Sequence, residues 1–440
     1  MDVRTMKNYI FSAIFLLTSG SFFLEAQTTK EELKADILKT GGVYYAYPTK
    51  VNQNTPAPEG YKPFYVSHYG RHGSRYLISD NDYKWILDLL EKAKKENALT
   101  VRGDSILNDL KQVWIEAEGR GGDLSPLGVK QHKGIASRLA HTYPEVFTDD
   151  AVITARSTPV VRCVLSMDAF CESLKEYNPE LEMSRDASHR YLDYLNYHSP
   201  QSNEFTGEKG VWRTEYSMFE REMTHPDRLV SSIFSSSEFI KKNVEPDRFI
   251  WGLYWIAVDM QNIETPVTFT QYFTPDELID LWQVVNYHNY VIDSSYPGSY
   301  GLVVGNARNL LENILEGAEE AVKTGKRGAT LRFGHDGNII PLTAILKLDG
   351  CYPSEWNPKD CYKVFSNFKV APMASNVQII FFRNEKDPHA SPLVKFLLNE
   401  EEVAVPLQTD IFPYYRWDDV RNLWTKTLEV YKIEKLKTDK

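Results

Sequence analysis

Apolar and polar positions divide the chain into strand-like and helix-like segments. Runs of β-branched and aromatic residues predict buried strands at 63–69, 151–155, 329–333 and 377–382. Helical patterns predict helices at 28–40, from 79 onward, at 125–139, across 162–170, and at 249–260, 276–290, 307–323 and 340–346. The segment 393–406 is typical of a hairpin that turns near Asn399-Glu400.

The order of these elements indicates the fold class. Strands and helices alternate before residue 175 and after residue 300, which is typical of a mainly parallel sheet in a three-layer α/β/α sandwich. The stretch 175–300 is rich in Tyr, Trp and Phe, has several helical patterns and lacks clear strand alternation. We therefore expect one α/β domain formed by 27–174 and 301–440, and an inserted, mostly helical lobe formed by 175–300.

Residues 1–26 have the pattern of a signal peptide. Arg4 and Lys7 precede an apolar run from about Tyr9 to Leu24, and Ala26-Gln27 is a plausible cleavage point. The alternative is a membrane anchor, but polar residues interrupt the run and its strongly apolar part is short for a span. We expect cleavage, a periplasmic or secreted protein, and no membrane span in the mature chain.

Composition narrows the classes of partner. The chain has 440 residues, 42% of them hydrophobic, which is enough for a large buried core. Its formal net charge of -10 argues against a general nucleic-acid-binding surface. An acidic protein that binds an anion must gather its cations into one pocket, so clustered arginines carry more information than the total charge. The sequence does not predict an oligomeric state.

The four cysteines would meet an oxidising compartment after export. Cys351 and Cys361 are ten residues apart in a loop-like stretch, where they could close a small loop as a disulfide or remain thiols. Cys163 and Cys171 lie in an expected helix, about 12 Å apart by helical rise, which is too far for a disulfide. We expect them to be buried thiols. No Cys/His spacing suggests zinc, and we expect neither a metal nor another cofactor.

The segment Arg71-His72-Gly73-Ser74-Arg75 follows the first expected strand. Strand ends in α/β sheets are where ligands bind, and Gly73 lets the backbone approach a ligand closely. Arginine offers paired, planar donors to phosphate oxygens. Adjacent cations also favour the neutral imidazole, which is the nucleophilic form. The segment can therefore hold a dianion against His72; the alternative is a structural histidine beside surface arginines.

A second polar segment, Phe333-Gly334-His335-Asp336-Gly337-Asn338, follows another expected strand. His335 can donate to a phosphoryl oxygen, and Asp336 can protonate a leaving alkoxide. The alternative for Asp336 and Asn338 is to cap the next helix.

Two further residues lie near the first segment and have structural interpretations. We expect His68 to be a packed strand histidine and Lys84 to be a surface lysine.

These two segments resemble the motifs of the histidine acid phosphatases, the second branch of the histidine phosphatase superfamily. That family has Arg-His-Gly-x-Arg early and His-Asp late, with a further phosphate-binding arginine on a helix between them. The segment Ser157-Thr158-Pro159-Val160-Val161-Arg162 resembles the start of that helix, and its matching arginine is Arg162 rather than Arg156. The resemblance spans most of the mature chain and is weak through the expected lobe.

The resemblance implies an α/β phosphomonoesterase that acts on a phosphorylated small molecule. It implies that His72 attacks phosphorus to form a phosphohistidine and that Asp336 is the general acid. The phosphate-binding residues that it implies are Arg71, Arg75, Arg162 and His335.

Two departures leave the subfamily open. Leu77 stands where many members have proline, and the late motif is His-Asp, whereas the multiple inositol polyphosphate phosphatases usually have His-Ala-Glu. Phytate or another inositol polyphosphate, a broad range of monoesters, and a sugar phosphate all stay open as substrates. A non-catalytic phosphate-binding protein is a more distant alternative, because His72 and Asp336 are both present.

Overall fold

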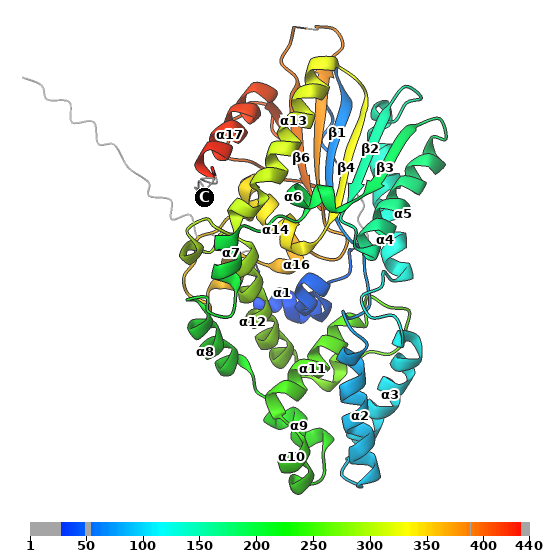
Figure 1. Ribbon diagram of the computed structural model, residues 1–440, viewed down its shortest axis with the longest axis vertical. Coiled ribbons are helices and arrows are strands. Elements are labelled where there is room, and N and C mark those ends of the chain that lie inside the picture. Colours follow the sequence, from blue (N-terminus) through cyan, green and yellow to red (C-terminus); the bar gives the residue numbers. More distant parts are fainter. Residues whose placement is uncertain (1–27, 49–53, 388, 433–440) are drawn as a thin grey trace, which may run out of the picture.

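The computed structural model describes residues 28–48, 54–387 and 389–432, so the expected signal peptide lies outside the described residues. A sheet of eight described strands occupies the upper half of the molecule in Figure 1, in the order β3-β2-β4-β1-β5-β6-β7 with β8 paired to β6. The strands are β1 (Tyr61–Arg71), β2 (Val152–Ser157), β3 (Glu182–Ala187), β4 (Gly328–Gly334), β5 (Asn376–Asn384), β6 (Leu393–Leu398), β7 (Glu401–Glu402) and β8 (Tyr414–Arg416).

The half of the sheet that carries the sequence motifs is parallel. Strands β3, β2, β4 and β1 are neighbours and all run in one direction. Beyond β1 the pairing is antiparallel, from β1 to β5, β5 to β6, and β6 to β7 and β8. Since β6 again runs in the direction of β1, five of the eight described strands share one direction. The expected mainly parallel sheet is confirmed, with an antiparallel edge.

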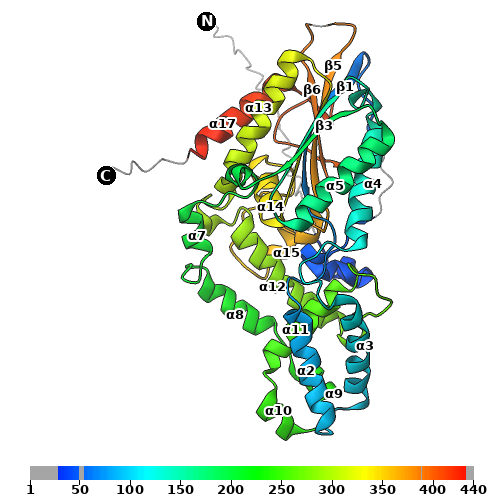
Figure 2. The same ribbon diagram turned by 45° about the vertical axis from the view of Figure 1, so that its right-hand side comes forward.

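Helices cover both faces of the sheet (Figures 1 and 2). On one face, α4 (Pro126–Thr142) and α5 (Val161–Tyr177) bury apolar residues such as Ile135 and Phe170 against the strands. On the other face lie α13 (Arg308–Thr324), α14 (Asp336–Ile345) and α17 (Trp417–Val430). The layers therefore follow the expected α/β/α order.

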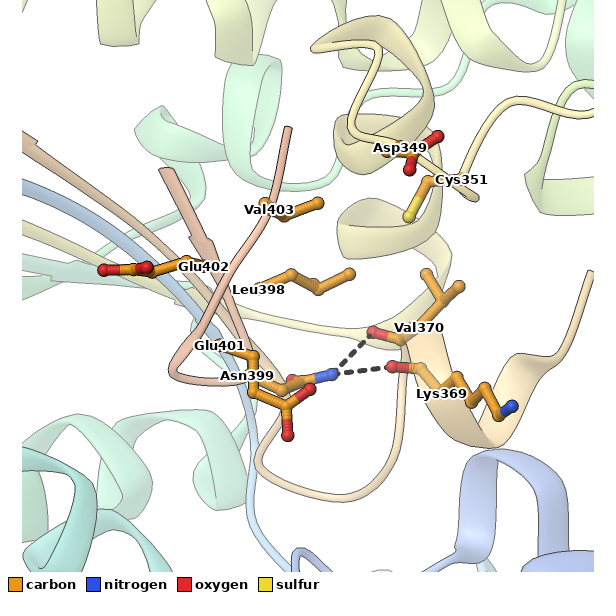
Figure 3. A pocket seen from close by; sticks show the side chains of 9 residues that line it. All are labelled: Asp349, Cys351, Lys369, Val370, Leu398, Asn399, Glu401, Glu402 and Val403. Carbon is orange, nitrogen blue, oxygen red and sulfur yellow. Dashed lines mark hydrogen bonds between the residues drawn. The ribbon is translucent and has the colours of Figure 1, made fainter. Parts of the chain in front are cut away.

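The hairpin between β6 and β7 turns at Asn399 and Glu400, as predicted. Both residues have positive φ angles, 51° and 66°, a conformation that asparagine tolerates better than most residues. The Asn399 Nδ2 atom donates to the carbonyl oxygen of Lys369 at 2.8 Å, which connects the turn to α16 (Asn367–Val370; Figure 3).

A pocket of about 190 Å³ lies beside this turn. It is lined by Asp349, Cys351, Lys369, Val370, Leu398, Asn399, Glu401, Glu402 and Val403.

A helical region lies beyond the carboxyl ends of the parallel strands, in the lower half of Figure 1. It consists of α2 (Asn81–Lys95), α3 (Val101–Ala117), α7 (Pro200–Thr206), α8 (Arg213–Met223), α9 (Asp227–Ile233), α10 (Ser237–Asn243), α11 (Pro246–Asp259) and α12 (Pro275–Asp293). The apolar faces of α2, α3, α9 and α11 pack together in one core cluster.

Two segments lie differently from the expected division at residues 175 and 300. Helices α2 and α3, which precede residue 175, pack in the helical region with α9 and α11. Strand β3, which lies inside 175–300, pairs with β2 in the sheet. Sequence patterns missed β3 because it is an edge strand with a mostly exposed surface and no apolar alternation. The division into 27–174, 301–440 and the lobe 175–300 otherwise stays a prediction.

The remaining described α-helices are short. They are α1 (Lys30–Ala35), α6 (Leu192–Leu195) and α15 (Cys361–Val364). The expected helix 28–40 is interrupted at Asp36, whose side chain caps a 3₁₀ helix, Ile37–Tyr44. None of the helices in the described ranges is both long and apolar enough to cross a bilayer.

All four cysteines are buried free thiols. For Cys163 and Cys171 this is the expected state. For Cys351 and Cys361 the structure shows the thiol alternative rather than the disulfide, and Cys361 accepts a hydrogen bond from Nδ2 of Asn286 at 3.8 Å.

Candidate active site

Parallel strand pairing brings the sequence motifs to one edge of the sheet. Arg71, the last residue of β1, is in register with Gly334, the last residue of β4. Ser157, at the end of β2, is in register with Phe333. Because the chain leaves all three strands at this edge, His72, His335 and the start of α5 with Arg162 lie together. The carboxyl ends of parallel strands are the usual location of ligand sites in α/β sheets.

His72 is oriented with one free ring nitrogen. It is 2% exposed, and its Nδ1 atom lies 2.9 Å from the carbonyl oxygen of Gly73. A carbonyl can only accept a hydrogen bond, so Nδ1 carries the proton and Nε2 keeps its lone pair. Burial and the charges of Arg71, Arg75 and Arg162 lower the pKa of His72 well below its usual value. The ring is therefore neutral and nucleophilic over the physiological range.

The loop after His72 is fixed by hydrogen bonds to two helices. The Gly73 amide donates to Oγ of Ser166 at 3.1 Å, and the Ser74 amide donates to Oε1 of Gln131 at 2.9 Å. A Cβ atom on Gly73 would lie 2.6 Å from the Cα atom of Gly128. Glycine is therefore required here by close packing against α4, whereas the sequence suggested an approach to a ligand.

Three arginines surround the nucleophile. Arg71 is fully buried, and its Nη1 atom donates to the carbonyl oxygens of Val43 and Ala371. Arg75 donates through Nη2 to the hydroxyl of Tyr44 at 2.9 Å. Arg162 is partly exposed on the first turn of α5. The Nε atoms of all three are buried and have no hydrogen-bond partner among the described residues.

The second motif completes the group. The ring of His335 lies 5.7 Å from that of His72, and its Nε2 atom lies 3.3 Å from Oγ1 of Thr158. Burial and the charge of Arg162 lower the pKa of His335 to about 4, although the charge of Asp336 opposes this shift. His335 is therefore a neutral group that can offer one N–H to an oxyanion.

Asp336 is the first residue of α14, and the N-cap position of this helix is occupied by His335 instead. Its Oδ2 atom lies 3.4 Å from Nη2 of Arg71. Burial raises the pKa of Asp336, but the charges of Arg71 and Arg75 oppose burial, and this pKa lies below its usual value. The carboxylate is therefore ionised in the unliganded site.

All six sequence-predicted site residues thus lie together. In the part of the chain that the structure describes, no cluster of three or more His, Cys, Asp or Glu side chains is arranged to hold a metal ion.

Two residues near the first motif have the structural roles that the sequence predicted. His68 is 1% exposed and packs against Phe170 and Phe333. Lys84 is a surface lysine paired with Asp88, also as expected.

Sequence patterns did not indicate two further residues at this site. Tyr44, from the 3₁₀ helix near the start of the described chain, accepts the hydrogen bond from Arg75. Asp293, at the end of α12, is hydrogen-bonded by Asn289 at 3.3 Å. Burial and the charge of Asp336 raise the pKa of Asp293 to about 7. Each stands alone in the sequence without a motif, so only tertiary structure relates it to the site.

Comparison with known proteins agrees with the geometry. A model of the histidine phosphatase superfamily (branch 2) matches residues 70–399. Among solved structures, the multiple inositol polyphosphate phosphatase of Bifidobacterium longum in complex with inositol hexasulfate is similar with a TM-score of 0.74. It is 18% identical, and the match covers 86% of this chain and 96% of that one.

Two phytases have similar folds at lower identity. The phytase from D. castellii matches with a TM-score of 0.63 and 16% identity, over 89% of this chain and 85% of that one. The apo form of the Hafnia alvei phytase matches with a TM-score of 0.52 and 12% identity, over 86% and 99%. A search of curated proteins found no match. The family match extends over most of the chain and includes all six site residues that the sequence predicted, so this protein belongs to branch 2 of the histidine phosphatase superfamily and is a phosphatase.

Proposed function

We propose that the protein hydrolyses phosphate monoesters through a phosphohistidine on His72. The Nε2 lone pair attacks phosphorus, so that an N–P bond forms while the ester P–O bond breaks. Asp336, protonated in the substrate complex, gives its proton to the departing alkoxide. Water then attacks the phosphohistidine and transfers a proton to Asp336, which releases inorganic phosphate and restores neutral His72.

The surrounding cations supply the transition-state stabilisation in this proposal. Arg71, Arg75, Arg162 and His335 would bind the equatorial oxygens, on which negative charge accumulates during transfer. Arg71 and Arg75 are buried, which makes their hydrogen bonds stronger than they would be in water. Held by strand ends and by helices α4 and α5, they need little rearrangement when a phosphate enters.

One observation supports this proposal most directly. The Nδ1–H of His72 is bound by the Gly73 carbonyl, and the opposite nitrogen is left free beside three arginines. A histidine that only bound phosphate would use an N–H as donor, and this orientation instead presents a lone pair. It therefore favours catalysis over the alternative of a non-catalytic phosphate-binding protein.

Inositol polyphosphates such as phytate are the first substrates to compare, because the similar solved structures include an inositol polyphosphate phosphatase and phytases. Broad-specificity acid phosphatase activity and sugar-phosphate phosphatase activity are the alternatives. Export is part of the proposal and depends on residues 1–26 alone. Amino-terminal sequencing of protein recovered outside the cytoplasm tests it, with a new terminus expected near Gln27.

Steady-state release of phosphate tests the activity. Wild type and His72→Ala are compared on p-nitrophenyl phosphate, phytate and glucose 1-phosphate. We expect the variant to lose at least about a thousandfold in kcat on each, since the nucleophile is removed. Undiminished turnover in this variant would rule out the covalent route. Equal efficiency of the wild type on all three would argue against a dedicated phytase.

A further inference from the structure

A cleft with aromatic walls lies beside the phosphate-binding arginines. It has a volume of about 220 Å³ and is lined by Tyr44, Leu77, Asp82, Trp85, Gly252 and Trp255. This is room for roughly seven water molecules, which is enough for one six-membered ring. Its walls come from Tyr44 of the 3₁₀ helix, from the loop after the nucleophile motif, and from α2 and α11.

Tyr44 connects the cleft to the phosphate site. The guanidinium of Arg75 lies 4.7 Å from the centre of the Tyr44 ring and donates to its hydroxyl. The same ring lies 5.6 Å from the Trp255 ring across the cleft wall. Tyr44 therefore contacts both Arg75, which would bind the phosphate, and Trp255, which lines the cleft.

The indole of Trp85 packs against the backbone of Gly252. A Cβ atom on Gly252 would lie 2.2 Å from Cζ2 of Trp85, so the absence of a side chain lets this indole lie directly on α11. Trp85 and Trp255 are both partly exposed, unlike the fully buried Trp282 of the nearby core. Their accessible surfaces give the cleft two flat, apolar contacts.

The polar group of the cleft is acidic. Among the described residues that line it, Asp82 is the only one with a carboxyl or a basic side chain. Its Oδ2 atom accepts from the Ser79 amide at 3.0 Å, and its second oxygen can accept from a hydroxyl group. Arg248, which lies 4.7 Å from the Trp85 ring, is paired with Glu245. A carboxylate repels further phosphates, whereas indole faces and a hydroxyl acceptor suit an uncharged sugar.

We propose that this cleft binds the neutral ring of a sugar phosphate, with the ring against Trp85 and Trp255 and a hydroxyl on Asp82. The proposal rests on the phosphomonoesterase function and specifies its substrate class as monophosphorylated sugars. It places the specificity for the leaving group in α2 and α11, outside the residues that bind the transferring phosphate.

The test compares kcat/KM on glucose 6-phosphate, on the acyclic ester glycerol 2-phosphate and on phytate. We expect the wild type to prefer glucose 6-phosphate. Trp255→Ala should lower kcat/KM for glucose 6-phosphate by about tenfold, the loss of one good apolar contact, and lower that for glycerol 2-phosphate far less. Asp82→Asn should lower kcat/KM for glucose 6-phosphate by about fivefold, the loss of one charged acceptor. Trp356→Ala is the control, because that indole is 57% exposed and does not line the cleft.

Circular dichroism and thermal unfolding identify any variant that fails to fold. If Trp255→Ala fails to fold, Asp82→Asn still tests the subsite. Equal losses on all three substrates, or none, in the folded variants would overturn the subsite. His72-dependent phosphate release would then still stand, so the phosphatase function would survive. Failure of the wild type to release phosphate from any of the three would overturn both proposals.

Discussion

The Nη2 atom of Arg71 lies 3.4 Å from Oδ2 of Asp336, across the edge of the sheet where β1 and β4 end. In the unliganded site the phosphate-binding cation and the proposed general acid are thus partners. A phosphate dianion competes for Arg71 and brings negative charge toward Asp336. Both effects raise the pKa of Asp336. Substrate binding would then itself protonate the group that must give a proton to the leaving oxygen.

Proton uptake on anion binding follows from this pairing. Inorganic sulfate is a suitable probe, because it stays a dianion and does not react. At pH 5 we expect its binding to the wild type to take up a fraction of one proton, measured by titration calorimetry in two buffers of different ionisation enthalpy. Asp336→Asn should bind sulfate with markedly less uptake. The same uptake in both proteins would show that another group takes the proton.

Asp336→Asn should also lower kcat by different factors on substrates with different leaving groups. An alkoxide needs a proton to depart, whereas p-nitrophenolate leaves without one. We expect kcat to fall by about 10²- to 10⁴-fold on glycerol 2-phosphate, the usual contribution of a general acid, and by much less on p-nitrophenyl phosphate. Turnover of the alkyl ester should decline as the pH rises, because the acid form of Asp336 is lost. An equal fall on both substrates would contradict the role of acid.

Arg162 should matter for turnover and little for stability. Its guanidinium is partly exposed, and its buried Nε atom has no partner among the described residues, so truncation removes few contacts. We expect Arg162→Ala to lower kcat/KM by about 10²- to 10³-fold, the effect of removing one oxyanion donor. Arg156→Ala, on the neighbouring strand β2, is the matched control and should be nearly neutral. A similar loss in both would indicate a general charge effect instead of a specific contact.

The motifs around His72 and His335 could be predicted because they are contiguous and each directly follows a hydrophobic strand. The strands and most helices were predictable for the same reason, since their apolar periodicity is local. Tyr44 and Asp293 were not, because a lone tyrosine or aspartate has no pattern to distinguish it from a surface residue. Their roles depend on which segments the fold brings together.

The same limit explains the differences in the fold. The apolar stripe of α2 shows that this helix buries one face but not which element covers it, and α3 and α11 both pack against α2 in the structure. Strand β3 gave no signal because Glu182, Arg185 and Asp186 occupy an edge where little surface is buried. Pairing with β2, and not its own sequence pattern, makes this segment a strand.

The partly buried carboxyl of Asp293 predicts a pH-dependent stability. Its pKa is raised to about 7, by burial first and then by Asp336, against roughly 3.9 in an unfolded chain. The native state therefore holds a proton that the unfolded chain releases. This stability is fully present below about pH 4 and is lost as the pH rises through about 7.

Asp293→Asn cannot ionise, so its stability relative to the wild type should improve from pH 5 to pH 8. We expect a gain on the order of 1–2 kcal/mol in the free energy of unfolding, less than the full shift because the side chain is partly exposed. Urea unfolding at the two pH values measures it. Asp419→Asn, an exposed residue of α17, is the control. A difference that does not change with pH would mean that Asp293 is already ionised in the folded protein.

Trapping of the phosphohistidine tests the central proposal most directly. Labelled phosphomonoester is mixed with enzyme and quenched within milliseconds in alkaline detergent, because a phosphorus–nitrogen bond survives base and is cleaved by acid. We expect the label to be found on the peptide that contains His72, and to be absent from His72→Ala. Phosphate release from the wild type with no label on His72 at any quench time, or label on another residue, would contradict the mechanism.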